Sequence, residues 1–350
     1  MVLKVYILND IEEANAYNTV LEQLDNKHPY YKVAFLDIFY DGLDNARAVA
    51  LFDTNEKPLV TMPFYLRPIE STLVKNELFF DVTSTWGYSG PLYNDDISEL
   101  ILNEFWSLVD SWYQNNNVVT EFLRFNTTNN TLGYNGQLVT IMNIVKGNLT
   151  TPEDIWNNYN RKVRKNINKA KRAQLYTKVH DNITDQVFDD FYKIFVHTMD
   201  RTEAKSQYYN SSEKLKLFFK AHSNNAAIAL TYNEDSKAIS SEIVLLSNHT
   251  MFSFIGGTLS EYFNQRPNED LKNEVIKWGI NKGFKYYVLG GGLGKEDGIF
   301  NYKKAFFPEN TVPFITGRKI LNKEIYNVLC SAIKEEDITD DFFPLYRLNV

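Results

Sequence analysis

Cysteine, histidine and proline are scarce in this chain of 350 residues, which has one cysteine, five histidines and ten prolines. The single cysteine, Cys330, excludes a disulfide within the chain and fits a reducing compartment. We interpret it as a small core residue rather than a nucleophile. The histidines lie far apart and show none of the spacings by which histidine binds zinc, so we expect no metal site.

Long apolar runs and an excess of positive charge are also missing. No apolar segment approaches the roughly 20 residues that a membrane-spanning helix needs, and the first residues turn acidic too soon for a secretory signal. The formal net charge is −7, whereas DNA-binding domains are usually basic. We therefore expect a cytoplasmic protein with no membrane span and no DNA partner.

Signatures of several enzyme classes are absent as well. No Walker loop, kinase signature or Gly-x-Ser-x-Gly elbow occurs, and Gly290–Gly294 is not a dinucleotide fingerprint because no long helix follows it. The chain does have a large hydrophobic content of 44%, with 24 phenylalanines and 22 tyrosines. This content suffices for packed cores, and the length suggests about two domains.

Apolar periodicity predicts the same order of elements in both halves of the chain. Residues 1–150 read as strand, two helices, three strands, helix and two strands, and residues 151–350 repeat this order after an added helix at Pro152–Ala173. A repeat of this size is a stronger signal than any single motif. It predicts a mixed α+β protein of two tandem domains, and one undivided domain is the alternative.

The stretch Lys285–Phe307 holds an apolar strand, three consecutive glycines, a polar loop and two lysines. Backbone amides can approach a ligand closely where no Cβ intervenes, which applies to Gly290, Gly291 and Gly292. Lys303, which follows Tyr302, can place positive charge beside that ligand. The stretch predicts the floor of a site for a phosphate or an acyl oxyanion, and a surface position is the alternative for Lys303.

Seven basic residues and no acid occur between Arg161 and Arg172. On a helix Arg161, Arg164 and Lys165 share one face, and so much like charge predicts an anionic partner. Arginine and lysine suit the phosphates of CoA, a nucleotide-linked sugar or an RNA end. A solvated helical surface is the alternative.

A second candidate region for binding a donor follows the strand that contains Gly256 and Gly257. Arg266 and Asn268 stand in the loop before the next helix, which we expect to begin near Asp270. Backbone amides and the helix dipole at such a junction can bind a pyrophosphate. An ordinary helix start capped by Asn268 is the alternative.

Glu242 is the candidate for a catalytic base. It shares a strand face with the apolar Val244. A carboxylate on such a face can have a raised pKa and accept a proton from an amine or hydroxyl. A solvated charge at a sheet edge is the alternative.

Trp86, Tyr88 and Ser89 are candidates for binding an acceptor. They lie in a loop that also contains Gly87 and Gly90. The two aromatic rings can stack on a sugar ring or a nucleobase. A plain turn is the alternative.

These motifs together resemble the Fem-type branch of the GNAT acyltransferases, which includes peptidoglycan-bridge aminoacyltransferases and acyltransferases of polysaccharide loci. The similarity lies in the basic run from Arg161, the strand and loop from Asp81 to Pro91, and the glycine loop before Tyr302 and Lys303. It spans nearly the whole chain. It implies two tandem GNAT-like domains, each with a mostly antiparallel central sheet flanked by helices. The first, 1–150, would hold the acceptor, and the second, 151–350, the donor and the catalytic residues.

The resemblance also implies an activity in cell-envelope biogenesis. An acyl group, acetyl first, would move from acyl-CoA to an amine or hydroxyl of a cell-envelope sugar or polysaccharide precursor. Lys303 would offset the charge that develops at the reacting carbonyl, and no cofactor would be tightly bound. An aminoacyl-tRNA donor for building peptidoglycan cross-bridges is the first alternative, favoured by the basic helix. A non-catalytic binding module with the same fold is the second.

Overall fold

The computed structural model describes residues 1–24, 28–39, 42–74, 77–128, 130–333 and 342–348. The chain forms two compact units, and the mixed α+β fold expected from the sequence is confirmed. The first unit comprises Met1–Asn26, Tyr30–Ile141 and Pro313–Val350, and the second comprises Lys27–Pro29 and Met142–Val312. The sequence pattern assigns residues 313–350 to the second domain, whereas their contacts group them with the first unit.

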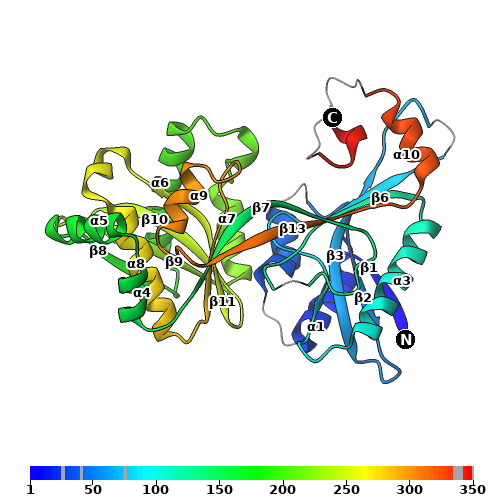
Figure 1. Ribbon diagram of the computed structural model, residues 1–350, viewed down its shortest axis with the longest axis horizontal. Helices are drawn as coiled ribbons and strands as arrows, with labels where there is room; N and C mark the ends of the chain where they lie inside the picture. The colour runs from blue at the N-terminus through cyan, green and yellow to red at the C-terminus, as the bar shows by residue number, and fades with distance from the viewer. Residues whose placement is uncertain (25–27, 40–41, 75–76, 129, 334–341, 349–350) are drawn as a thin grey trace. The chain divides into compact units, whose positions relative to one another are not determined.

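The first unit is a mostly antiparallel sheet with helices. Its strand order is β1-β2-β3-β4-β6-β13, in which β4 and β6 are parallel and β5 pairs with β3. The elements are β1 (Val2–Ile7), α1 (Ile11–Gln23), α2 (Val33–Phe39), β2 (Ala46–Phe52), β3 (Pro58–Pro68), β4 (Phe80–Thr83), β5 (Leu92–Tyr93), α3 (Glu99–Asn115), β6 (Val118–Arg124), β13 (Thr311–Ile320) and α10 (Lys323–Cys330) (Figure 1).

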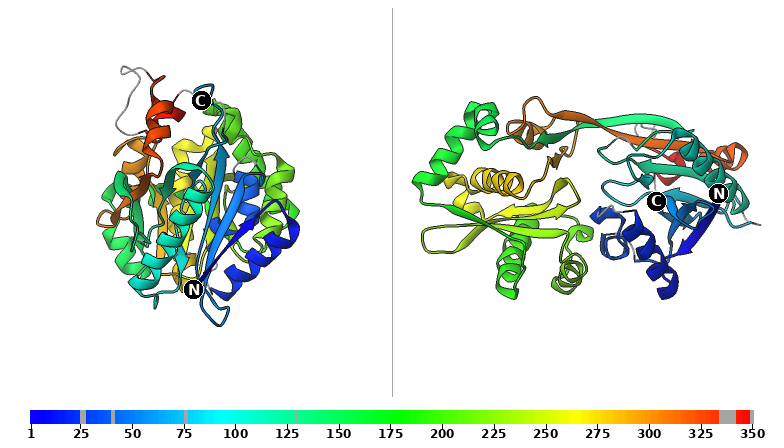
Figure 2. Two further views of the ribbon diagram at one scale, coloured as in Figure 1. Left: turned by 90° about the vertical axis from the view of Figure 1, so that its right-hand side faces the viewer. Right: turned by 90° about the horizontal axis from the view of Figure 1, so that it is seen from below.

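The second unit repeats this plan with the strand order β7-β12-β11-β10-β9-β8, in which β11 and β12 are parallel. Helix α8 covers one face of the sheet, and α6 and α7 cover the other (Figure 2, right). The elements are β7 (Gln137–Asn148), α4 (Pro152–Asn158), α5 (Arg161–Arg172), β8 (Tyr176–His180), α6 (Asp185–Arg201), α7 (Ser212–Ala221), β9 (Ala226–Tyr232), β10 (Ala238–Leu246), β11 (Thr250–Thr258), α8 (Pro267–Asn281), β12 (Tyr286–Gly290) and α9 (Gly298–Lys304).

The two halves exchange their last strands. Strand β7 ends the first half of the sequence, yet it pairs with β12 of the second unit. Strand β13 ends the second half, yet it pairs with β6 of the first unit. The predicted repeat of elements is therefore present, and the exchange explains why the contacts place residues 313–350 with the first unit.

The single helix expected at Pro152–Ala173 is wrong, because two helices, α4 and α5, occupy this segment. Tyr159 adopts an extended conformation between them, with ψ of 139°. The Asn160 side chain then accepts a hydrogen bond from the Lys162 amide and caps α5. Tyr159 packs edge-on against Phe306 with 5.6 Å between ring centroids, so the break anchors this corner to the core.

Candidate functional site

The parallel strands β11 and β12 part at the centre of the second unit. Their ladder joins Thr250–Phe252 to Tyr286–Val288, whereas β11 continues to Thr258 and β12 to Gly290. The register between β10 and β11 also shifts at Ile243/Val244. Beyond the ladder, the facing strand edges can offer backbone groups to a ligand, as exposed sheet edges do.

A buried ion pair links the strands beside this parting. Lys272 of α8 is 6% exposed, and its Nζ contacts Oε1 of Glu242 on β10. It also donates a hydrogen bond of 2.8 Å to Ser253 Oγ on β11. The hydroxyl of Tyr287 on β12 donates to the same Glu242 oxygen at 2.8 Å. One ammonium and one carboxylate thus connect α8 with three neighbouring strands.

Glu242 is 2% exposed and is therefore a core carboxylate rather than a solvated edge charge. Lys272 and Tyr287 both bind Oε1. The other oxygen, Oε2, is buried and has no hydrogen-bond partner in the part of the chain that the structure describes. Since buried polar atoms are nearly always hydrogen-bonded, Oε2 is suited to receive an N–H or O–H group of a ligand.

Lys303 on α9 lies close enough to this network to feel its charges. Its Nζ donates a hydrogen bond of 2.6 Å to the carbonyl oxygen of Gly291. Burial and the charge of Lys272 lower the pKa of Lys303 to about 8, against the opposing effects of Glu242 and Asp297. A lysine with this pKa is still mostly an ammonium at neutral pH, but it loses its proton at a lower pH than a surface lysine does.

Tyr302 turns its ring toward the core of the second unit and packs edge-on against Phe306 at 5.4 Å. Its buried hydroxyl has no hydrogen-bond partner among residues with a described placement. Burial, with the carboxylates of Glu269 and Glu242, raises the pKa of Tyr302 well above its ordinary value. The hydroxyl therefore stays protonated and can donate to a ligand.

The loop after the glycines already binds an anion of its own. Asp297 Oδ2 accepts hydrogen bonds from the amides of Leu293 at 2.7 Å and Gly294 at 3.1 Å, and Oδ1 accepts one from Phe300 at 2.8 Å. These backbone bonds lower the pKa of Asp297. A Cβ at Gly292 would lie 1.9 Å from Oδ1, so this glycine makes room for the carboxylate. The amides of Leu293 and Gly294 are therefore engaged rather than open to a ligand.

The other candidate glycines have local structural roles. Gly290 has a φ of +78°, which turns the chain at the end of β12. Gly257 lies beneath α6, where a Cβ would come within 2.2 Å of Thr198 Oγ1. Gly256 pairs with Glu242 in the β10–β11 ladder, and a Cβ there would lie 2.9 Å from the Ser241 carbonyl oxygen. Close packing is thus a sufficient reason for both glycines of β11.

Helix α8 begins at Pro267, three residues before the expected start. Asn268 therefore lies inside its first turn, and the alternative reading of Asn268 as the cap is wrong. Proline suits the first helical position because its missing N–H would have no partner there. Arg266 precedes it in a left-handed conformation with φ of 67°, and its side chain does not cap the helix. Arg266 is exposed, and its guanidinium remains a candidate for binding a donor.

The first turn of α8 is acidic and buried. Glu269 is 8% exposed and accepts a hydrogen bond of 2.7 Å from Asn166, and Asp270 is 3% exposed and accepts one of 2.8 Å from Thr177. Burial raises the pKa of both carboxyl groups. The dipole of a helix attracts anions at this end, but here two side-chain acids occupy it. The residues present therefore fit the pyrophosphate of CoA poorly.

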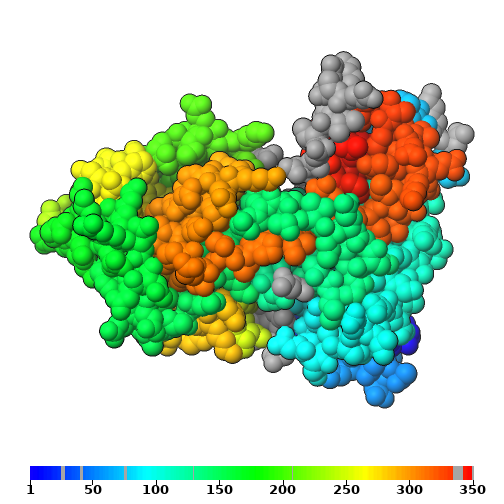
Figure 3. Space-filling model, in the orientation of Figure 1, coloured from blue at the N-terminus to red at the C-terminus, as the bar shows by residue number. Residues whose placement is uncertain are grey.

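The green segment that contains α4 and the basic helix α5 lies beside the orange α9 on the surface of the second unit (Figure 3), and α5 itself packs against α8. The amide of Asn160 donates to the carbonyl of Ala305 at 2.9 Å, which ties the start of α5 to the end of α9. Arg164 donates to the carbonyls of Asn157 at 2.9 Å and Trp156 at 3.3 Å and so closes the end of α4. Among the three basic residues proposed for phosphate, Arg161 and Lys165 are exposed.

The acceptor candidates belong to the first unit. Trp86 is 48% exposed, whereas Ser89 is 1% exposed. The Tyr88 ring packs edge-on between Tyr30 at 5.4 Å and Phe314 at 5.6 Å. The loop is therefore held by its own packing. Of the three candidates, Trp86 is the one whose side chain is exposed to solvent.

Sequence reasoning missed Lys272, which supplies the counter-charge of Glu242. The signal was present in the helical spacing, because Lys272 stands one turn before Ile276 on the buried face of α8. A lysine at a core position of an amphipathic helix needs an anionic partner. Looking for that partner on the strands would have found Glu242.

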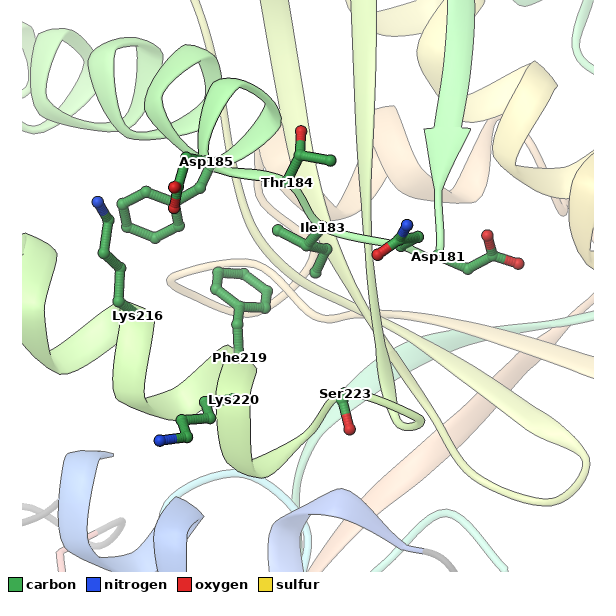
Figure 4. A pocket seen from close by; sticks show the side chains of 10 residues that line it. Asp181, Ile183, Thr184, Asp185, Lys216, Phe219, Lys220 and Ser223 are labelled. Atoms are coloured by element: carbon green, nitrogen blue, oxygen red, sulfur yellow. The ribbon is translucent and has the colours of Figure 1, made fainter.

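A pocket of about 280 Å³ lies elsewhere in the second unit, between the loop that starts α6 and the end of α7 (Figure 4). Phe188, Phe219 and Lys216 contribute to its lining, and none of the residues around Lys303 takes part.

Over the described ranges, no helix is both long and apolar enough to cross a membrane. Nor do three or more His, Cys, Asp or Glu side chains gather there in a way that could hold a metal ion.

Known proteins share the fold of this chain. Residues 157–304 match the family model described as an acetyltransferase (GNAT) domain. A search of curated protein sequences finds no match. FemX is a similar solved structure, with 11% identity, a TM-score of 0.64 and coverage of 94% of this chain and 99% of FemX.

Two further solved structures have the same fold. The first, L-PGS from Bacillus licheniformis, has 12% identity and a TM-score of 0.56, and the match covers 90% of this chain and 94% of the L-PGS chain. The other is the C-terminal domain of a putative lysylphosphatidylglycerol synthetase from Agrobacterium fabrum, with 8% identity, a TM-score of 0.59 and coverage of 90% and 93%. Residues 157–304 of the second unit therefore match a GNAT acetyltransferase domain, and the chain as a whole has the same fold as FemX.

Proposed function

We propose that this chain is an aminoacyltransferase, which moves an aminoacyl group from the 3′ ester of a tRNA to an amine or hydroxyl of a cell-envelope precursor. The observation that carries the proposal is the Lys303 ammonium, which is held at the Gly291 carbonyl and feels the charge of the buried Glu242, within the segment that matches a GNAT domain. An acyl-CoA donor, which the sequence favoured, becomes the second candidate.

The charge distribution is the reason for reversing the order of donors. Glu269 and Asp270 occupy the start of α8, where a GNAT domain would be expected to bind the pyrophosphate of CoA. Arg161 and Lys165 stand exposed on α5, which adjoins α9. Lysine and arginine that contact a phosphate chain supply most of the affinity for a nucleic acid. A tRNA end can therefore bind to the exposed side chains of Arg161 and Lys165, while the carboxylates of Glu269 and Asp270 are buried and engaged by Asn166 and Thr177.

Lys303 is placed to act on the reacting carbonyl. When the nucleophile attacks the ester, negative charge develops on the carbonyl oxygen, and an ammonium in a water-poor site stabilises this charge more than it stabilises the ground state. Glu242 Oε2 can accept the proton that the nucleophile loses. A new bond to nitrogen or oxygen forms, the ester C–O bond breaks, and the leaving ribose hydroxyl takes up a proton.

The test is a transfer assay with both donors. The purified chain is incubated with tRNA charged with a mixture of labelled amino acids, or with labelled acetyl-CoA, and with an extract of cell-envelope precursors. We expect label to leave tRNA and enter the precursors. Lys303→Ala should lower this rate by about 100-fold or more, as loss of an oxyanion donor does. The neighbouring Lys304→Ala is the matched control and should behave like the wild type.

Each other result replaces the proposal with a defined alternative. Transfer from acetyl-CoA alone would make the chain an acyl-CoA-dependent enzyme. If neither donor reacts and Lys303→Ala changes no binding in a thermal-shift assay with charged tRNA, the chain is a binding module. Equal loss of transfer in Lys303→Ala and Lys304→Ala would remove the special role of Lys303.

A further inference from the structure

Lys272 is a buried charge that the proposed reaction does not use. The Lys272 side chain is only 6% exposed, which is unusual for a lysine. It contacts Glu242 of β10, Ser253 of β11 and Tyr287 of β12. Removing an ammonium from water costs several kcal/mol unless paired charges and hydrogen bonds compensate. A position that demands such compensation suggests a role beyond filling space.

Glu242 would otherwise seek a different partner. It is buried together with Lys272, and Lys303 is a second cation that feels its charge. An unpaired carboxylate in the core attracts any ammonium within reach, because the low dielectric strengthens the attraction. Lys303 now donates to the Gly291 carbonyl at 2.6 Å instead. Lys272, and not Lys303, forms the ion pair with Glu242.

We propose that Lys272 is a positioning residue, which neutralises Glu242 beside the parting of β11 and β12 and thereby keeps the Lys303 ammonium at Gly291, available to a substrate. The inference gives a role within the proposed acyl transfer. Its arrangement of charges, however, can be tested without any substrate.

The groups that act on Lys303 come from three directions. Lys272 approaches from α8, Glu242 from β10, and Asp297 from the loop before α9. Lys272 lowers the pKa of Lys303, and the two carboxylates raise it. Removal of the Lys272 charge ends the repulsion and leaves Glu242 free to attract Lys303. Both changes raise the pKa of Lys303, so the ammonium should hold its proton to higher pH.

The experiment measures how fast an amine-reactive reagent labels Lys303 between pH 7 and pH 10, with mass spectrometry of the peptide that contains it. Only the neutral amine reacts. In the wild type, labelling should rise steeply near pH 8. In Lys272→Met, labelling of Lys303 at pH 8 should fall by about fivefold or more, because a pKa rise of one unit from about 8 lowers the neutral fraction from about one half to about one tenth. Lys272→Arg keeps the charge and should retain the wild-type profile.

Lys277→Met is the matched control, because Lys277 lies on the same helix, is 39% exposed and pairs with Glu274. Its labelling profile at Lys303 should equal that of the wild type. A folded Lys272→Met protein with unchanged Lys303 labelling would overturn the inference.

A double variant keeps the test decisive if Lys272→Met does not fold. Lys272→Met combined with Glu242→Gln leaves no unpaired buried charge and removes two opposing influences on Lys303. Its labelling at pH 8 should stay within about threefold of the wild type. A fall of about fivefold or more in the double variant, as in Lys272→Met alone, would show that Lys272 does not act through Glu242. A shift in labelling without any acyl transfer would retain this inference and refute the proposed function.

Discussion

The two units build the same parallel junction and use it differently. In the first unit, β4 pairs with β6 along its whole length, and the contact continues through Ser84 N to Phe122 O at 2.9 Å and Ser89 N to Arg124 O at 2.9 Å. In the second unit the corresponding ladder of β11 and β12 stops after Phe252. One junction is closed by main-chain hydrogen bonds, and the other is left open beside buried charges. This difference is the reason why we propose the chemistry in the second unit.

The buried lysines show the same contrast. Lys319 of the first unit is surrounded by acids, with Asp110 at 2.6 Å and Glu121 at 3.6 Å. Lys303 of the second unit instead donates to the Gly291 carbonyl. A lysine that is paired with carboxylates stabilises the fold, whereas a lysine that donates only to a neutral carbonyl can also bind a substrate. The predictions below test this distinction.

The largest effect is expected for Lys319→Met. Burial raises the pKa of Glu121, and the charge of Lys319 opposes this. Removing one partner of a buried ion pair costs about 3 kcal/mol or more, so the free energy of unfolding in urea should fall by about that amount. The exposed Lys323→Met is the control. Lys303→Ala should show the reverse pattern, with stability within about 1 kcal/mol of the wild type and transfer lost. Equal destabilisation by Lys303→Ala and Lys319→Met would abolish the contrast.

A smaller effect is expected when a single methyl group is added to the glycine loop. Gly292→Ala would place its Cβ against Asp297, displace the carboxylate that orders the loop and move the Gly291 carbonyl. A misplacement of about 1 Å near a reacting group can cost up to about 100-fold in rate, and we expect a loss of tenfold or more in kcat. Gly294→Ala meets nothing within 4 Å and should be nearly silent. Similar losses in both variants would mean that the loop is sensitive to any substitution.

The smallest effect concerns pH. The pKa of Lys303 is lowered to about 8, so its ammonium is present below this pH and is lost above it. If the ammonium stabilises the transition state, kcat/KM should decline as pH rises through about 8 and fall about tenfold per further unit. Lys303→Arg, where it retains transfer, should lack this decline because arginine keeps its charge. A wild-type rate that rises steadily to pH 10 would instead assign Lys303 a neutral role.

Local pattern predicted much of this molecule. The order of strands and helices follows from apolar periodicity. The start of α8 was misplaced because Asn268 is a good cap, although Pro267 is a better first residue. The occupation of the loop amides by Asp297 depends on a turn whose geometry the sequence does not display. The partners of Lys272 and of β13 lie far away in sequence, and periodicity carries no information about such partners.

The exchange of last strands has a consequence for synthesis of the protein. The first sheet gains the strand β13 only after Ile320 has left the ribosome, and β7 must await β12, whose residues are made long after its own. Until then each nascent sheet presents unpaired backbone to the cell, a hazard for aggregation. Neither half is a transplantable module, and a gene cut near codon 150 would encode two fragments that each need the other to be completed.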